Sequence, residues 1–228
     1  MIEMLGATDQ FAMEHPWLAG LMQRMFSTSA KPCTDHQFQV PVRFSHTPFG
    51  TRSYCLAGSG SPTVIFESGL GDGKEVWAPV FNALSRKVRV LAYDRAGYGQ
   101  SDDSSWTRDG FQIVHELRAL LRTENIAPPY VLVGHSLGGT LVKLFARTYP
   151  DEVAGVVLVD AREADFVQRC RKMGLLRLLY EPPLALFMLG RSAMRSELQA
   201  ANATMGQARA TGVFPNIPLR GLTHRRRI

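Results

Sequence analysis

Ser136 stands in the segment Gly134-His135-Ser136-Leu137-Gly138, which follows the strand-like run Tyr-Val-Leu-Val and precedes a helical pattern. A serine nucleophile on so sharp a strand-to-helix turn needs a strained backbone and small residues two positions before and after it. Gly134 and Gly138 meet that need. The turn would present the Ser136 hydroxyl at the carboxyl edge of a sheet and place the Leu137 N–H at a helix N-terminus, facing developing negative charge. These five residues, the nucleophile elbow, predict a serine used in acyl transfer.

A glycine-rich segment at residues 66–73, Phe-Glu-Ser-Gly-Leu-Gly-Asp-Gly, follows an earlier strand-like run. Acyl transfer needs a second N–H donor for the oxyanion, and a loop rich in glycine lets the backbone come close enough to supply it. We expect the N–H of Leu70 to be that donor. The alternative is a flexible turn, which the elbow downstream disfavours. A third segment, residues 93–102, is interpreted as a structural loop that buttresses the elbow.

The elements that would position these residues alternate between apolar runs and helical patterns. Strands are expected at residues 42–46, 52–57, 63–67, 88–93, 130–134, 155–160 and 217–222. The first two would form an antiparallel pair, and the last five are the near-continuous apolar runs of strands buried on both faces. Helices are expected at 76–85, 110–125 and 137–149, with lengths suited to right-handed crossovers. The alternation predicts an α/β protein with a doubly wound, mostly parallel sheet.

The pattern divides the chain into four predicted regions. Residues 1–40 form an N-terminal arm with an amphipathic helical stretch at 16–26, and residues 41–164 form the α/β core. Residues 165–214 carry helical patterns only, and an insertion of this size exceeds what a connection between strands needs. We therefore expect a helical cap over one end of the sheet. Residues 215–228 would hold a final core strand and a basic tail.

Composition restricts the class of protein. The chain has 228 residues, long enough for one domain with a sizeable core, and no apolar run approaches the roughly 20 residues of a membrane span. Its start lacks a secretory pattern, so a cytoplasmic location is predicted. The three cysteines suggest neither a disulfide framework nor a zinc site. Residues 1–161 carry 14 Lys/Arg against 16 Asp/Glu, whereas 162–228 carry 12 against 4, an excess that we interpret as a solvated face rather than a nucleic-acid site.

These segments, with Ala-Gly-Val-Val-Leu-Val-Asp at residues 154–160, resemble the α/β-hydrolase superfamily, and the Glu-Ser-Gly at 67–69 resembles a subgroup that carries it in place of His-Gly. The resemblance covers residues 42–165 well, 166–222 loosely and 1–40 hardly at all. It implies hydrolysis of a small-molecule ester, amide or related acyl substrate through an acyl-enzyme, without metal or organic cofactor. Serine at position 136 argues against the superfamily's dehalogenases and epoxide hydrolases, which use aspartate there.

The acid of a catalytic triad should follow Ser136 in sequence and precede the histidine. Asp160 ends a predicted strand on the edge where Ser136 emerges, and some relatives take their acid from this strand, so Asp160 is the candidate. The alternative is that Asp160 only caps the strand end, and Asp165 is a weaker second choice. His224 is the one histidine after these acids, but it lies close behind a strand rather than on the long return loop of the relatives.

The missing return loop predicts a chain that stops before the last strand of the fold. A missing strand would leave an open sheet edge, through which two copies of the chain could pair. Two functions therefore stay open. One is a carboxylic-ester hydrolase with Ser136 and Asp160 as catalytic residues and the N–H groups of Leu70 and Leu137 as the oxyanion hole. The other is a catalytically impaired, hydrolase-like protein that binds a small apolar ligand or a partner.

Overall fold

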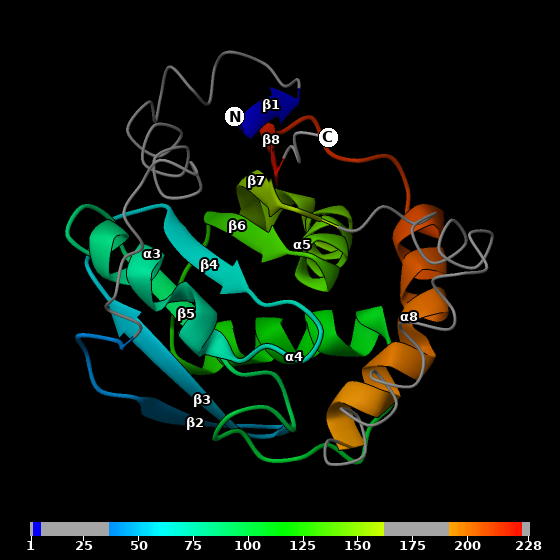
Figure 1. The fold of residues 1–228 in the computed structure, drawn as a ribbon, viewed down its shortest axis with the longest axis horizontal. Helices are drawn as coiled ribbons and strands as arrows, with labels where there is room; N and C mark the ends of the chain where they lie inside the picture. Colours follow the sequence, from blue (N-terminus) through cyan, green and yellow to red (C-terminus); the bar gives the residue numbers. More distant parts are fainter. Residues whose placement is uncertain (1, 6–36, 162–191, 225–228) are drawn as a thin grey trace.

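The computed structural model describes residues 2–5, 37–161 and 192–224 (Figure 1). In these residues one eight-stranded sheet has the order β1-β8-β7-β6-β4-β5-β3-β2. The strands from β8 to β5 in that order run parallel. Antiparallel pairs join β1 to β8 at one end, and β3 to β5 and β2 to β3 at the other. The predicted α/β architecture with a mostly parallel sheet is confirmed.

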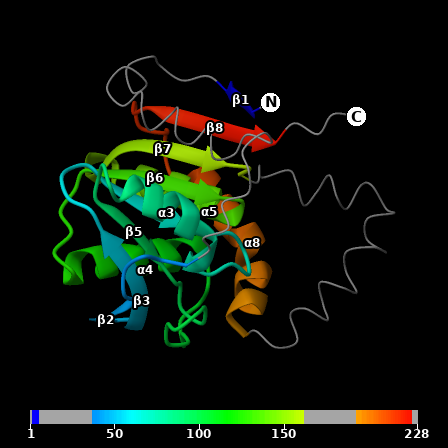
Figure 2. The ribbon, with the colours of Figure 1, turned by 60° about the vertical axis from the view of Figure 1, so that its left-hand side comes forward.

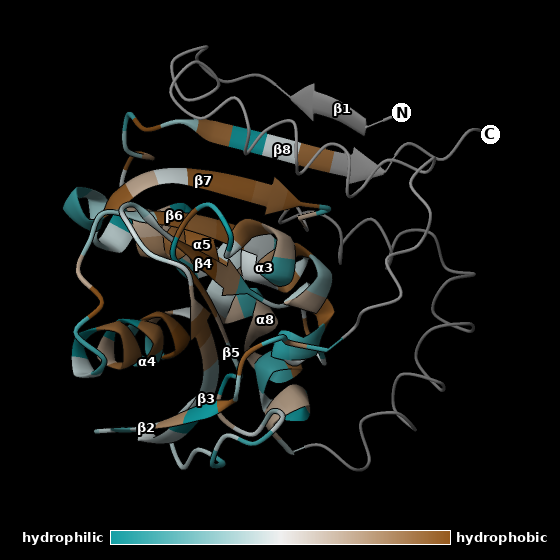
Figure 3. Cartoon of the chain, turned by 90° about the vertical axis from the view of Figure 1, so that its left-hand side faces the viewer, coloured by the Kyte–Doolittle hydropathy of each residue, from teal (hydrophilic) through white to brown (hydrophobic). Residues whose placement is uncertain are grey.

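The five parallel strands correspond to the apolar runs of the sequence. They are β4 (Thr63–Glu67), β5 (Val90–Tyr93), β6 (Tyr130–His135), β7 (Val153–Val159) and β8 (Leu219–His224). All residues of β4 and β5 are buried, because both faces of these strands are covered. β7 is brown, the colour of apolar residues, along most of its length in Figure 3.

Helices cover both faces of this sheet (Figures 1 and 2). The 3-10 helix η1 (Lys74–Trp77) and helix α3 (Ala78–Leu84) lie on one face, where Trp77 and Phe81 join the strand residues of the core. Helices α4 (Gly110–Thr123) and α5 (Leu137–Thr148) lie on the other face, and a short 3-10 helix, η2 (Pro150–Glu152), follows α5. Helix α8 (Ser192–Ala210) packs against α4 and α5.

The two ends of the sheet differ from one another. At one end β2 (Arg43–Thr47) and β3 (Gly50–Ala57) form the expected antiparallel pair. At the other end β1 (Ile2–Leu5) pairs with β8, with Ile2 opposite His224 and Leu5 opposite Gly221. The edge of β8 was predicted to be open, but β1 occupies it. The unpaired backbone groups of an edge strand readily accept another strand. Pairing between two copies of the chain stays a prediction and would have to use β1 or β2.

Parts of the predicted organisation lie outside the described residues. These are the helical stretch at 16–26, the cap from residue 165 to 191, Asp165 and the last four residues of the tail. Helix α8 falls within the segment for which the sequence predicts helices. None of the helices in the described ranges combines the length and apolarity needed to cross a membrane.

Candidate active site

Ser136 occupies the turn between β6 and α5 and is the N-cap of that helix. Its φ is 52° and its ψ is −114°, a left-handed conformation that costs a residue with a side chain on the order of 1–3 kcal/mol. Two hydrogen bonds hold this backbone: the Ser136 N–H donates to the Val159 carbonyl at 3.1 Å, and the Gly139 N–H donates to the Ser136 carbonyl at 3.1 Å. The surrounding structure thus enforces the strained turn that a nucleophile elbow requires.

The two glycines of the elbow are needed for space rather than for flexibility. A Cβ on Gly134 would lie 2.4 Å from the carbonyl oxygen of Gly138. A Cβ on Gly138 would lie 2.3 Å from the carbonyl oxygen of Glu67 and 2.7 Å from that of Ser68. The start of α5 therefore packs directly against the end of β4, which puts Ser136 beside the glycine-rich loop.

This loop, residues 68–73, follows β4, and β4 is the parallel neighbour of β6 with Glu67 opposite Gly134. The side chains of Leu70 and Leu137 pack in one apolar cluster with Ile113 and Leu141. The structure thus brings together the two residues whose N–H groups were predicted to form the oxyanion hole. Among the described residues, the N–H of Leu70 has no hydrogen-bond acceptor.

Side chains fix the loop at several points. The Trp77 Nε1–H donates to Ser68 Oγ at 3.0 Å, and the Ser68 hydroxyl donates to the Gly73 carbonyl at 3.0 Å. The Gly71 N–H donates to the Tyr98 hydroxyl at 3.4 Å. These hydrogen bonds tie the loop to the residues around it.

Arg95 lies in contact with the same loop and is almost completely buried. Its Nη1 donates to Glu67 Oε1 at 2.6 Å and to the Ser68 carbonyl at 2.7 Å, and its Nη2 donates to the Gly69 carbonyl at 2.7 Å. Its Nε and Nη2 also donate to the two carboxylate oxygens of Glu197 on α8, both at 3.0 Å. All five N–H donors of the guanidinium are therefore used. The segment predicted to support the elbow supports the loop after β4 through this side chain.

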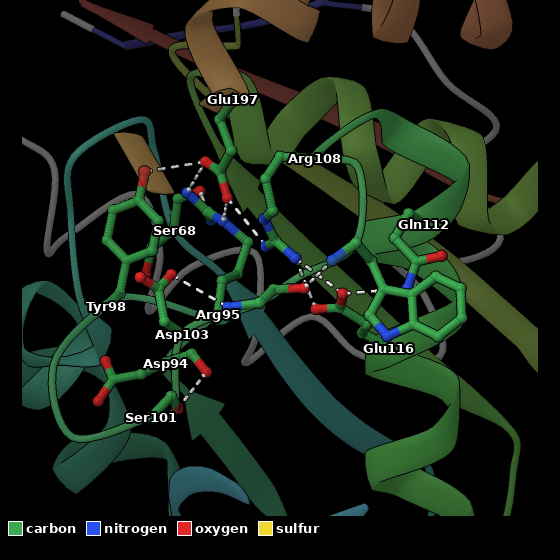
Figure 4. Close-up of polar contacts among 12 residues, drawn as sticks. Ser68, Asp94, Arg95, Tyr98, Ser101, Asp103, Arg108, Gln112, Glu116 and Glu197 are labelled. Atoms are coloured by element: carbon green, nitrogen blue, oxygen red, sulfur yellow. Dashed lines mark hydrogen bonds and ion pairs between the residues drawn. The ribbon is translucent and has the colours of Figure 1, made fainter. Parts of the chain in front are cut away.

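A second buried arginine extends this cluster of charges toward α4. Glu197 accepts hydrogen bonds from Arg95, from the Tyr98 hydroxyl at 2.9 Å and from Arg108 Nη2 at 3.1 Å, as Figure 4 shows. Arg108 Nη1 binds both carboxylate oxygens of Glu116 at 2.8 Å. A partner 102 residues away in the chain, as Glu197 is from Arg95, cannot be identified from local sequence patterns, and the sequence prediction missed this network. The local signal was a charged residue at or just after the end of each of two buried strands: Glu67 ends β4, and Arg95 is the second residue after β5.

Burial and ion pairing shift the pKa values in this network. Burial raises the pKa of Glu67, and the charge of Arg95 and the hydrogen bond from Tyr93 only partly oppose the shift. Burial alone lowers the pKa of Arg95, but the charges of Glu197 and Glu67 hold it well above its usual range, so Arg95 stays charged. Burial and the charge of Glu197 raise the pKa of Tyr98 to about 12.

Asp160 lies where the sequence predicted it, directly after β7 on the edge of the sheet that carries Ser136. It is exposed, has a φ of 44°, and its N–H donates to the Leu222 carbonyl at 2.7 Å. Its carboxylate has no hydrogen-bond donor among the described residues. His224 is the last residue of β8, and its side chain lies outside the described part of the chain.

His135 and Asp72 form a pair that sequence reasoning did not foresee. The Nδ1 of His135 lies 3.6 Å from Asp72 Oδ2, and both side chains are 37% exposed. A Cβ on Gly69 would lie 3.0 Å from that Nδ1, so the imidazole is directed toward the glycine-rich loop. The pair connects the elbow to the loop.

Comparison with known proteins places this geometry in a family. Residues 62–206, more than half of the chain, match the family model of the alpha/beta hydrolase fold. YqjL of Bacillus subtilis (strain 168) is 36% identical over 108 residues, which are 47% of this chain and 43% of YqjL. The protein named "Putative carbamate hydrolase RutD" of Serratia proteamaculans (strain 568) is 36% identical over 103 residues, 44% of this chain and 38% of RutD. The chain thus spans less than half the length of these two relatives.

A solved structure extends the likeness over more of the chain. The enol-lactonase from Burkholderia xenovorans LB400 superposes with a TM-score of 0.59, covering 78% of this chain and 79% of its own, at 20% sequence identity. At that identity the likeness shows a shared fold alone. The family match covers more than half of the chain, and the parallel sheet and the serine turn agree with it. The chain therefore belongs to the α/β-hydrolase family.

Proposed function

We propose that the protein is a serine hydrolase that cleaves carboxylic esters or related acyl substrates through an acyl-enzyme. The observation that carries this proposal is the left-handed backbone of Ser136 at the turn between β6 and α5, held against the loop after β4. Such strain is maintained at functional sites because the surrounding structure fixes it. A serine in a turn without a catalytic role needs neither this conformation nor two glycines packed against backbone.

The proposed reaction has two acyl-transfer steps. Ser136 Oγ attacks the carbonyl carbon while its proton passes to a base, and the electron pair of the carbonyl moves onto oxygen. The N–H groups of Leu70 and Leu137 stabilise this oxyanion. Its collapse expels the alcohol, which takes up the proton, and leaves an ester on Ser136. Water then attacks this ester in the same way and releases the acid.

Asp160 is proposed as the acid that orients and stabilises the base. Its place on the same sheet edge as Ser136 supports this role. The name of RutD describes a carbamate hydrolase, and a carbamate offers a nucleophile the same kind of electrophilic carbonyl carbon as an ester. This relative supports a small-molecule acyl substrate.

Hydrolysis of a short-chain p-nitrophenyl ester tests the proposal. We expect Ser136→Ala to lower kcat by more than about 10³-fold, because a triad acts as a unit. If Asp160→Asn and His224→Ala lower kcat by similar factors, these two residues are identified as the acid and the base. Ser59→Ala, in an exposed turn, is the matched control and should keep full activity.

Labelling with a fluorophosphonate provides a second readout that needs no knowledge of the substrate. The wild type and Ser59→Ala should be labelled, and Ser136→Ala should not. If folded wild-type protein shows neither turnover nor labelling that depends on Ser136, the hydrolase proposal is wrong. The alternative, a hydrolase-like protein that binds a small apolar ligand, would then be supported.

A further inference from the structure

We propose that Arg95 is a positioning residue that orients the oxyanion-hole peptide, and that α8 holds Arg95 in place through Glu197. The inference rests on the proposed function, because it concerns the donor that Leu70 supplies. It adds a link from a helix late in the chain to the oxyanion hole.

The argument begins with the peptide that joins Gly69 and Leu70. This peptide is trans and planar, so the carbonyl of Gly69 and the N–H of Leu70 point in opposite directions. Arg95 Nη2 binds that carbonyl at 2.7 Å. Holding the oxygen toward Arg95 directs the N–H away from Arg95, and the side chain of Leu70 packs in the same cluster as Leu137 of the elbow.

The preceding peptide is fixed in the same way. Arg95 Nη1 binds the Ser68 carbonyl at 2.7 Å, which leaves neither peptide free to rotate. Glycine at position 69 makes this restraint necessary, because a residue without a Cβ has little conformational preference of its own. An inverted peptide would turn a carbonyl, and so a negative partial charge, toward the oxyanion.

Glu197 determines where the guanidinium of Arg95 can lie. Its carboxylate binds Nε and Nη2 side by side, the planar two-bond geometry that arginine offers and lysine does not. Glu197 and Arg95 are 1% and 3% exposed, so each buried charge depends on the other for compensation. Arg108 and Tyr98 bind the same carboxylate and keep it in place.

The contrast with the other buried arginines strengthens the assignment. The Nε atoms of Arg52 and Arg108 are buried without a hydrogen-bond partner among the described residues, whereas every donor of Arg95 is used. The acceptors of Arg95 include two consecutive backbone carbonyls of the loop. A side chain needed only to balance charge would not have to bind both.

The test uses a readout that does not change when a variant merely contains less active protein. A short alkyl trifluoromethyl ketone adds to Ser136 Oγ and forms a hemiketal oxyanion, so its inhibition constant reports how well the oxyanion hole is formed. We expect Arg95→Lys to raise this constant by about 10- to 10³-fold, approaching the loss of one oxyanion donor. The value of kcat should fall by a similar factor, with KM changed by less than about threefold.

Glu197→Gln should change both constants in the same direction, because it removes the charge that holds Arg95 and keeps one acceptor oxygen. Arg118→Lys is the matched control: Arg118 also binds a glutamate, Glu152, through Nε and Nη2, but it lies on α4 and contacts no loop carbonyl. Its inhibition constant should equal that of the wild type. If Arg95→Lys does not fold, the inhibition constant of Glu197→Gln is compared with that of Arg118→Lys to test the positioning role.

The two proposals fail in different ways. An unchanged inhibition constant in Arg95→Lys and Glu197→Gln, with turnover that still depends on Ser136, would overturn the positioning role and leave the hydrolase intact. If Arg95→Lys lowers the stability but leaves kcat per active site and the inhibition constant unchanged, Arg95 has a structural role only. Wild-type protein without activity that depends on Ser136 would overturn the hydrolase proposal, and the role in catalysis with it.

Discussion

At the scale of single residues, the elbow depends on how close two backbone segments come. Gly138 lies in the first turn of α5, where alanine would ordinarily favour the helix by about 1 kcal/mol. The carbonyl oxygens of Glu67 and Ser68 occupy the space that its methyl group would need. In the described part of the chain, no atom outside the backbone of α8 lies within 4 Å of the equivalent position on Gly206. The same substitution at these two helical glycines should therefore have opposite effects.

We expect Gly138→Ala to lower the free energy of unfolding by about 1–3 kcal/mol, the usual range for an overpacked site. Gly206→Ala, the control, should raise it by about 0.5–1 kcal/mol, because only the helix propensity changes. Urea denaturation of both variants measures these differences. Equal stability of the two variants would contradict the close packing of α5 on β4.

At the scale of elements, α4 connects the charge network to the core and begins at a side-chain cap. Asp109 has extended backbone angles, and its Oδ1 accepts a hydrogen bond from the Gln112 N–H at 3.1 Å. This bond satisfies one of the N–H groups that a helix leaves unpaired at its start, and the negative charge interacts favourably with the helix dipole. Glu116, a partner of Arg108, lies two turns into this helix.

Asp109→Ala should therefore lower the free energy of unfolding by about 1 kcal/mol. Asp109→Asn keeps an acceptor oxygen at the cap and should retain most of the stability. Urea midpoints of the two variants give the comparison, and a loss as large in Asp109→Asn as in Asp109→Ala would show that the cap bond is not the cause.

The elements show which parts of the fold a sequence can predict. Strands β4 and β6 and helix α5 follow from buried apolar runs and local turn chemistry, and so do the positions of Ser136 and the loop after β4. The four residues of β1 carry too little pattern, and their partner β8 is over 200 residues away. The pairing of Arg95 with Glu197 was missed for the same reason, because Glu197 lies 102 residues beyond Arg95. Local signals specify local geometry, whereas long-range pairs depend on the completed fold.

At the scale of the whole molecule, burial of tyrosine hydroxyls links stability to alkaline pH. Burial raises the pKa values of Tyr54, Tyr98 and Tyr130 to about 12, and that of Tyr93 well above 10. A tyrosine with a raised pKa holds its proton more tightly in the folded protein than in the unfolded chain. Its contribution to stability is fully present below pH 10 and is lost as the pH rises through about 12.

We expect the free energy of unfolding to fall steadily between pH 10 and pH 12. The part of the ultraviolet absorbance of tyrosinate that comes from these four residues should increase together with the loss of tertiary structure rather than before it. Protein unfolded in denaturant is the control, and its tyrosines should ionise near pH 10. Ionisation of all tyrosines near pH 10 in the folded protein would contradict the burial of these hydroxyl groups.

The pairing of β1 with β8 has a consequence for folding during synthesis. Residues 2–5 leave the ribosome long before the strand that they pair with, which ends at residue 224. None of the hydrogen bonds between them can form until almost the whole described chain has emerged, and contacts at such separation form slowly. The backbone groups on the edge of β7 that faces β8 also stay unpaired until β8 has been synthesised. Among the described strands, those on this side of the sheet therefore stay unpaired longest in a nascent chain, and a chaperone would have most time to bind there.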